Sequence, residues 1–143
     1  MNRQIVLDEE DRGWDELTEA FGRIPPDRFE DPTLTPDGWS PKDTMYHVAS
    51  WAEEAATVLG RIAVGTHREG PVDVERMNQE WFAVSRSMDP DVVRLRFAKA
   101  RISMREAFLR VDEVDAVALE WFEESGARHY AEHLPDLRAF ADR

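Results

Sequence analysis

The sequence predicts an all-α protein, a four-helix bundle with a short accessory helix at about residues 73–87. Three observations support this fold class. Apolar residues recur at spacings of three and four over several long segments. Helix start and stop signals separate these segments, and no alternating β-branched run indicates a strand. The 143 residues match the size of one domain, so we expect a single domain over 1–143.

The first helix is expected over residues 7–24, because its apolar residues fall on one stripe at helical spacing. Pro25 and Pro26 cannot continue a helix and end it. Residues 25–39 are rich in Pro and Asp and are expected to form an irregular connection. The stripe consists of Trp14, Leu17, Phe21 and Ile24.

The second helix has the clearest start in the sequence. Ser40 is a favourable N-cap, Pro41 suits the first helical turn, and Asp43 lies near the positive end of the helix dipole. The helix is expected to end near Gly65. Its core stripe contains Met45, Val48, Ala49, Ala52, Ala56, Leu59 and Ala63.

Two more long segments follow the accessory helix. The first opens at Asp89-Pro90 and has a core stripe formed by Val93, Phe97, Ala100, Met104, Ala107 and Val111. Leu95, Ile102 and Leu109 mark a second apolar face on the same helix. Residues 112–123 fit a loop, an extended segment or a short turn equally well. The last helix is expected over about 124–142, with a kink at Pro135.

The composition excludes several classes of function. The chain has no Cys, which rules out disulfides, thiolate zinc sites and cysteine nucleophiles. A net charge of −12 disfavours broad binding to nucleic acid or to anionic membranes. No apolar segment has the length of a signal-peptide core or a membrane span, so we expect a cytoplasmic protein. We interpret the basic run Arg94, Arg96, Lys99, Arg101 and Arg105 as a solvated helix face.

Three of the four histidines are candidates for one metal site. His129 and His133 are four residues apart, so on a helix they share one face. His47 lies about two turns into the second helix, and helix bundles build metal sites from facing helices. Three imidazoles suit Zn²⁺ or Ni²⁺ and leave a coordination position open. Helical spacing offers carboxylates to orient the rings, namely Asp43, Glu132 and Asp136.

Three segments together resemble one protein family. They are GWSPKDTMYHVASWAEE at 38–54, DVERMNQEWFAVSR at 73–86, and ARHYAEHLPDLRAF at 127–140. In order and spacing they resemble the DinB-like superfamily, and especially its ClbS/DfsB branch of four-helix bundle proteins. The resemblance implies a bundle in which His47 meets the pair His129 and His133. It also implies a divalent metal, commonly zinc or nickel, although members of the ClbS/DfsB branch need not use one.

The same resemblance suggests activities on small electrophilic molecules. Superfamily members include transferases and isomerases that use bacillithiol, mycothiol or glutathione, and hydrolytic resistance proteins. The candidate substrate-binding residues are Trp51, Asn78 and Trp81, with core filling as the simpler reading of each tryptophan. Glu54 lies one heptad beyond His47 and is a candidate base. Tyr46 and Tyr130 are candidate catalytic groups, but adjacent helix positions point about 100° apart, so neither must face the histidines.

Three functions therefore remain open at the level of sequence. The first is a metal-dependent hydrolase or thiol transferase that acts on an electrophilic small molecule. The second is a metal-free hydrolase or sequestering resistance protein of the ClbS/DfsB kind, in which the histidines and tyrosines act as hydrogen-bonding or acid–base groups. The third is a non-catalytic binding module that forms a homodimer through an apolar bundle face.

Overall fold

Six α-helices follow one another along the chain in the computed structural model, which describes residues 1–143. No strand is present, which confirms the predicted fold class. A single 3₁₀ turn, Pro26–Arg28, lies in the connection after the first helix. The helices are α1 Arg3–Gly22, α2 Pro41–Ala63, α3 Val74–Ser85, α4 Pro90–Leu109, α5 Ala116–Ser125 and α6 Ala127–Ala141.

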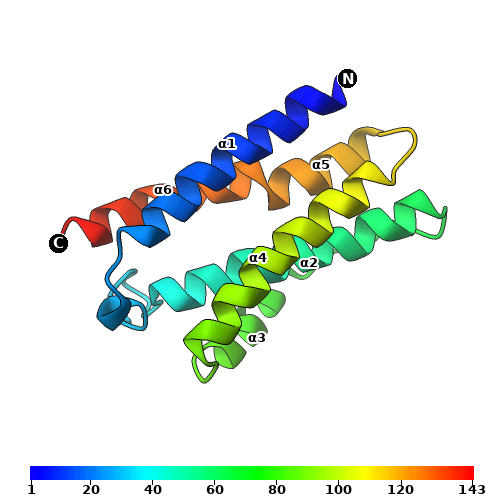
Figure 1. The fold of residues 1–143 in the computed structure, drawn as a ribbon. Helices are drawn as coiled ribbons and strands as arrows, with labels where there is room; N and C mark the ends of the chain where they lie inside the picture. Colours follow the sequence, from blue (N-terminus) through cyan, green and yellow to red (C-terminus); the bar gives the residue numbers. More distant parts are fainter.

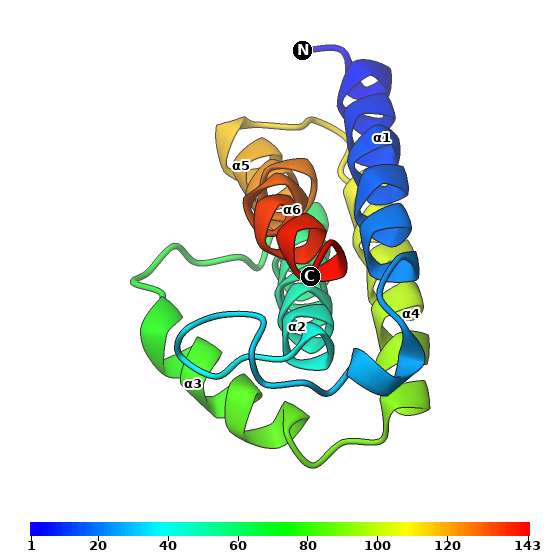
Figure 2. The same ribbon diagram turned by 90° about the vertical axis from the view of Figure 1, so that its left-hand side faces the viewer.

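Four helical segments form the bundle. The fourth segment consists of α5 followed by α6. α2 packs mainly against α4, and α1 packs mainly against α6. α5 and α6 follow each other along one side of the molecule (Figure 1). α3 contacts α2 at the periphery, where a long loop leads to it (Figure 2). The structure therefore has the bundle and the accessory helix that the sequence predicts.

Side-chain capping determines where α1 and α2 begin. The side chain of Ser40 accepts a hydrogen bond from the backbone of Asp43, and the Asp43 carboxylate accepts one from the backbone of Ser40, as predicted for α2. α1 starts at Arg3 rather than at residue 7, because the Asn2 side chain caps the backbone N–H groups of Gln4 and Ile5.

The last third of the chain differs most from expectation. Residues 116–125 form α5, whose first turn is capped by the side chain of Asp115. The helix expected over 124–142 is thus divided at Gly126 into two helices. A Cβ atom at Gly126 would lie 2.7 Å from the carbonyl oxygen of Phe122, so only glycine fits at this break. Pro135 lies inside α6, which continues to Ala141.

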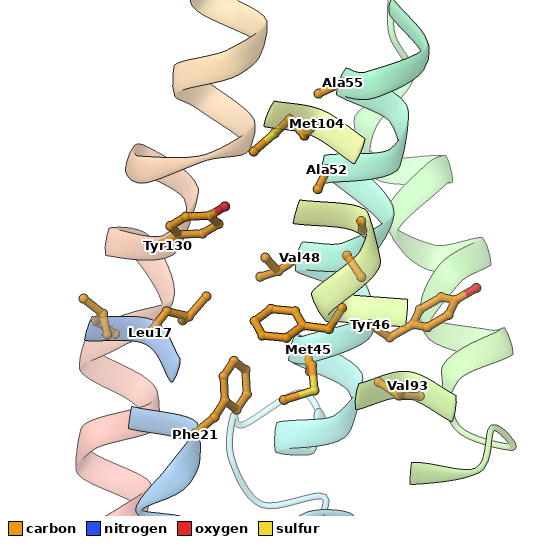
Figure 3. Packing of buried hydrophobic residues seen from close by; sticks show 14 of the residues in the cluster. Leu17, Phe21, Met45, Tyr46, Val48, Ala52, Ala55, Val93, Met104 and Tyr130 are labelled. Carbon is orange, nitrogen blue, oxygen red and sulfur yellow. The ribbon is translucent and has the colours of Figure 1, made fainter. Parts of the chain in front are cut away.

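The core fills the space between the four helical segments. Figure 3 shows Leu17 and Phe21 of α1 pointing toward Met45 and Val48 of α2. Every residue of the predicted α4 core stripe is buried. The second apolar face of α4 is not, because Leu95, Ile102 and Leu109 remain 59%, 53% and 51% exposed. None of the six helices combines the length and the apolar composition that a membrane span requires.

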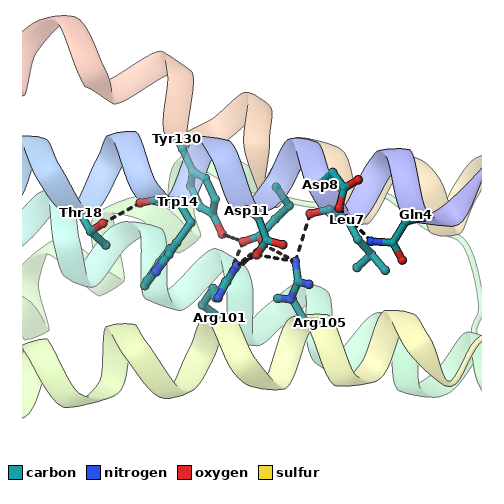
Figure 4. Close-up of polar contacts among 10 residues, drawn as sticks. Gln4, Leu7, Asp8, Asp11, Trp14, Thr18, Arg101, Arg105 and Tyr130 are labelled. Carbon is teal, nitrogen blue, oxygen red and sulfur yellow. Dashed lines mark hydrogen bonds and ion pairs between the residues drawn. The ribbon is translucent and has the colours of Figure 1, made fainter.

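A buried carboxylate joins three helices. Glu10 of α1 is fully buried and accepts hydrogen bonds from Arg101 and Arg105 of α4. The hydroxyl of Tyr130 donates a hydrogen bond of 2.8 Å to the same carboxylate from α6 (Figure 4). This network fixes the rotation of α6 about its axis at the residue next to His129.

Candidate metal centre

The structure brings the three predicted histidines together. His47 comes from the second turn of α2, His129 from the first turn of α6, and His133 from the next turn. The Nε2 atom of His129 lies 2.9 Å from Nε2 of His47 and 3.0 Å from Nε2 of His133. One ring nitrogen from each residue lies within 4.8 Å of the other two. This is the arrangement that the resemblance implies.

Burial lowers the pKa of all three imidazoles, which favours their neutral form. Burial, together with the neighbouring His133, lowers the pKa of His47 to about 3. Burial and the two other histidines hold the pKa of His129 well below its usual value. Burial also lowers the pKa of His133, although Asp136 opposes this shift. Neutral imidazole is the form that binds a metal, because its ring nitrogen keeps a free lone pair.

Hydrogen bonds among the histidines cannot satisfy this cluster. A neutral imidazole has one N–H donor and one acceptor nitrogen. The Nδ1 atoms of His47 and His129 are buried without a partner, so the Nε2 atoms carry all the polar contacts of these two rings. Nε2 of His129 lies within hydrogen-bond distance of the Nε2 atoms of both His47 and His133. In a neutral ring this nitrogen offers either one N–H donor or one lone pair, so it can form only one of the two hydrogen bonds. A cation accepts three lone pairs at once, which removes the conflict.

The spacing of the nitrogens also fits a divalent ion. Zn²⁺ lies about 2.0–2.1 Å from an imidazole nitrogen, so two nitrogens on one ion are roughly 2.9 Å apart at a right angle and roughly 3.4 Å apart at the tetrahedral angle. The separations of the His129 Nε2 atom from those of His47 and His133, 2.9 Å and 3.0 Å, fall at the short end of this range. The residues present therefore fit the metal that the sequence suggests.

The carboxylates expected to orient the rings do not bond to them. Asp43 binds the hydroxyl groups of Ser40 and Ser85, at 2.9 Å and 2.6 Å, instead of His47. Its place in the capping box at the start of α2 explains this difference. Glu132 lies in the wall of the adjoining pocket, and Asp136 acts on His133 only through its charge.

Aromatic packing positions His47 instead. The ring of Trp39 meets the His47 ring edge-on, with 5.2 Å between centroids, and stacks on Phe82 of α3 at 5.0 Å. The sequence places Trp39 only near the start of α2. Its contact with His47 depends on the path of the loop before α2, which no local pattern predicts.

A pocket of about 770 Å³ opens beside the histidines. Its floor is one face of α2, on which successive residues are spaced by four, three, four and three: His47, Trp51, Glu54, Val58 and Arg61. α5 and α6 form the opposite wall, which includes Trp121 and His129. The loop at 67–72 and the start of α3 close the far end. A volume of this size is typical of small-molecule sites.

Two of the three candidate substrate-binding residues line the pocket, and the third packs behind its wall. Trp51 and Asn78 both line the pocket, and the indole N–H of Trp51 donates a 2.8 Å hydrogen bond to the Asn78 side chain. Trp81 packs edge-on against Trp51 at 5.0 Å and lines a small separate cleft of about 190 Å³. Trp81 therefore supports the pocket wall from behind.

The candidate catalytic residues are placed differently from one another. Glu54 lines the pocket on the same face of α2 as His47, and no hydrogen bond or ion pair occupies its carboxylate. Tyr46 is buried toward α4, where its hydroxyl accepts a 3.2 Å hydrogen bond from Arg96. The hydroxyl of Tyr130 is bound to Glu10. The structure thus brings Glu54 to the pocket but neither tyrosine.

Comparison with known proteins gives one match. The family model described as the mycothiol maleylpyruvate isomerase N-terminal domain matches residues 11–140, nearly the whole chain. This range contains all three histidines and every helix that contributes to the pocket. No curated protein and no solved structure matches the chain.

Proposed function

The chain belongs to the mycothiol maleylpyruvate isomerase N-terminal domain family, within the DinB-like superfamily, and on this premise we propose that it is a metal-dependent enzyme. In this proposal His47, His129 and His133 hold a divalent ion, zinc or nickel. The reaction joins a low-molecular-weight thiol to an electrophilic small molecule, or isomerises that molecule through the thiol. Convergence of the three Nε2 atoms at the edge of a 770 Å³ pocket supports it most directly.

In this proposal the thiol is a co-substrate, because the chain supplies none of its own. It contains no Cys, so an attacking thiolate must come from a small molecule. When bound, a divalent ion supplies Lewis acidity, which lowers the pKa of a thiol or water that reaches its open position. The family description names mycothiol, which is the first thiol to test. The proposed setting is the cytoplasm, where thiols are kept reduced.

The protein's own side chains have three further roles in this proposal. Glu54 takes up the thiol proton, because it is the α2 carboxylate nearest along the pocket floor to His47 and has no internal partner. Trp51 and Asn78 form the wall against which the electrophile packs. The buried rings of His47 and His129 keep the reacting end of the pocket poor in water.

Metal binding can be tested directly with a matched control. We expect purified protein to bind about one Zn²⁺ or Ni²⁺ per chain and His129→Ala to lose this binding. His67→Ala should keep it, because His67 lines the same pocket but lies outside the histidine cluster. Zn²⁺ at a hundred times its Kd should add about 2.7 kcal/mol to the free energy of unfolding. Wild-type protein that remains empty at micromolar Zn²⁺ would contradict the proposal.

Activity assays separate the thiol reaction from its alternatives. An activated aryl halide should react faster with mycothiol, bacillithiol or glutathione when the zinc-loaded protein is present. Glu54→Gln should lower kcat more than it raises KM, whereas Val58→Ala at the same pocket floor should affect mainly KM. Hydrolysis without added thiol would identify a metal-dependent hydrolase instead. Activity that survives chelation but fails in His47→Ala would favour the metal-free ClbS/DfsB type.

A further inference from the structure

The outer face of α4 carries a line of exposed apolar side chains. Leu95, Ile102 and Leu109 are each more than half exposed and are spaced by seven residues. A straight helix drifts only about 20° per heptad, so these three side chains lie within roughly 40° of one another. The opposite face of α4 carries the buried residues Phe97 and Met104. Single exposed apolar residues are ordinary on protein surfaces, whereas three at heptad spacing on one helix face form a pattern that suits a helical partner.

We propose that this outer face of α4, defined by Leu95, Lys99, Ile102, Glu106 and Leu109, binds the same face of a second copy of the chain. The two α4 helices run antiparallel about a two-fold axis beside Ile102. A symmetric interface requires a surface that complements itself. This axis places Leu95 of one copy opposite Leu109 of the other, and Ile102 opposite Ile102.

Charge complementarity supports a second copy as the occupant. Lys99 and Glu106 are seven residues apart and border the apolar line on the same side. In the antiparallel pair each Lys99 therefore lies opposite Glu106 of the second copy. A parallel two-fold pair would instead place Lys99 at the height of the second Lys99, and Glu106 at the height of the second Glu106, with no opposite charge at either level.

Lys99 and Glu106 are also free for this role. Both are exposed and neither has an ion pair within the chain. Three other basic residues of α4 are already paired internally, Arg96 with Glu53 and both Arg101 and Arg105 with Glu10. Between Leu95 and Leu109, this leaves Lys99 and Glu106 as the exposed charged side chains without an ion pair.

The size of the face predicts a weak dimer. α4 has 20 residues, so it is about 30 Å long and about 10–12 Å wide. Pairing along its whole length buries on the order of 300–400 Å² per copy, or about 600–800 Å² in total, which is below the roughly 1,200–2,000 Å² of stable interfaces. We therefore expect a Kd in the micromolar range and a dimer that dissociates on dilution.

Analytical ultracentrifugation of the full chain from about 1 to 500 μM tests the proposal. We expect Lys99→Glu to raise the dimer Kd at least tenfold, because it places two pairs of like charges in the interface. The double variant Lys99→Glu with Glu106→Lys restores the attraction and should return Kd to within threefold of wild type. Because both side chains are exposed, circular dichroism and the melting temperature should barely change.

A control variant and two outcomes complete the test. Val84→Glu on α3 replaces an apolar residue of comparable exposure, 49%, outside the α4 face, and should leave Kd unchanged. A wild-type protein that stays monomeric up to 500 μM overturns the proposal. A dimer whose Kd does not respond to Lys99→Glu also overturns it, because that dimer uses another surface. Rescue by the double charge reversal supports the antiparallel pairing specifically.

Discussion

Replacing Glu10 by Gln should destabilise the bundle strongly, because it removes the only buried carboxylate that joins α1, α4 and α6. The Glu10 side chain is 1% exposed and accepts hydrogen bonds from Arg101 at 2.7 Å and Arg105 at 2.6 Å. Removing one partner of a buried ion pair costs about 3–5 kcal/mol. The loss should fall near 3 kcal/mol here, because both arginines are partly exposed and also contact Asp11.

Urea unfolding measures this loss, and a matched variant controls for it. A fall of about 3 kcal/mol at unchanged m-value shows that the native state lost stability. Glu16→Gln removes a second carboxylate of α1, but that group forms an exposed 3.6 Å pair with Arg138. Its loss should cost less than about 1 kcal/mol. If Glu10→Gln also costs less than about 1 kcal/mol, the network does not hold the three helices together as we describe.

Three further predictions test the fold and the site separately. Tyr130→Phe should cost about 1–2 kcal/mol in urea unfolding, because it removes the hydroxyl bound to Glu10; a change in zinc affinity above threefold would show that Tyr130 also belongs to the metal site. Lys42→Met should cost about 2–3 kcal/mol, because the buried ammonium binds Glu30 and the carbonyl of Met88; equal urea midpoints would contradict this role. In the metal-free protein the pKa of His47, about 3, lies below its unfolded value of about 6.5. Stability from this residue is present above pH 6.5 and is lost toward pH 3, at up to about 1.4 kcal/mol per pH unit. Metal-free His47→Gln should therefore lose urea stability less steeply than wild type between pH 7 and 5, and parallel pH profiles would argue against a buried neutral ring.

The sequence predicts the fold well where the signals are local. Ser40 and Asp89 start α2 and α4 as expected, because a capping side chain bonds to the backbone two or three residues further on. The sequence fails at residues 112–126. α5 is capped by Asp115 and ends at Gly126, whereas the sequence predicts a loop, an extended segment or a short turn for residues 112–123, because 10 residues with a mixed apolar pattern carry no clear helical period.

The residues of the candidate site also fall into two groups: those that local spacing predicts and those that only tertiary contacts place. His129 and His133 share a face because of their spacing alone, and Glu54 shares the α2 face with His47 for the same reason. Trp39 could not be assigned to His47, because the contact joins a loop to a helix. Asp43 was expected near His47, but its carboxylate is engaged by Ser40 and Ser85, and the bond to Ser85 of α3 depends on how two helices meet.

The sequence by itself determined the helices other than α5, most of their inward faces and the pairing of His129 with His133, because these follow from interactions within a few residues of the chain. Only the tertiary structure decided which hydrogen-bonding groups found partners. It directed Tyr46 and Tyr130 to Arg96 and Glu10, away from the pocket. It also left Leu95, Ile102 and Leu109 in solvent, because a helix in a bundle of this size buries one face and the apolar residues on its other face remain exposed.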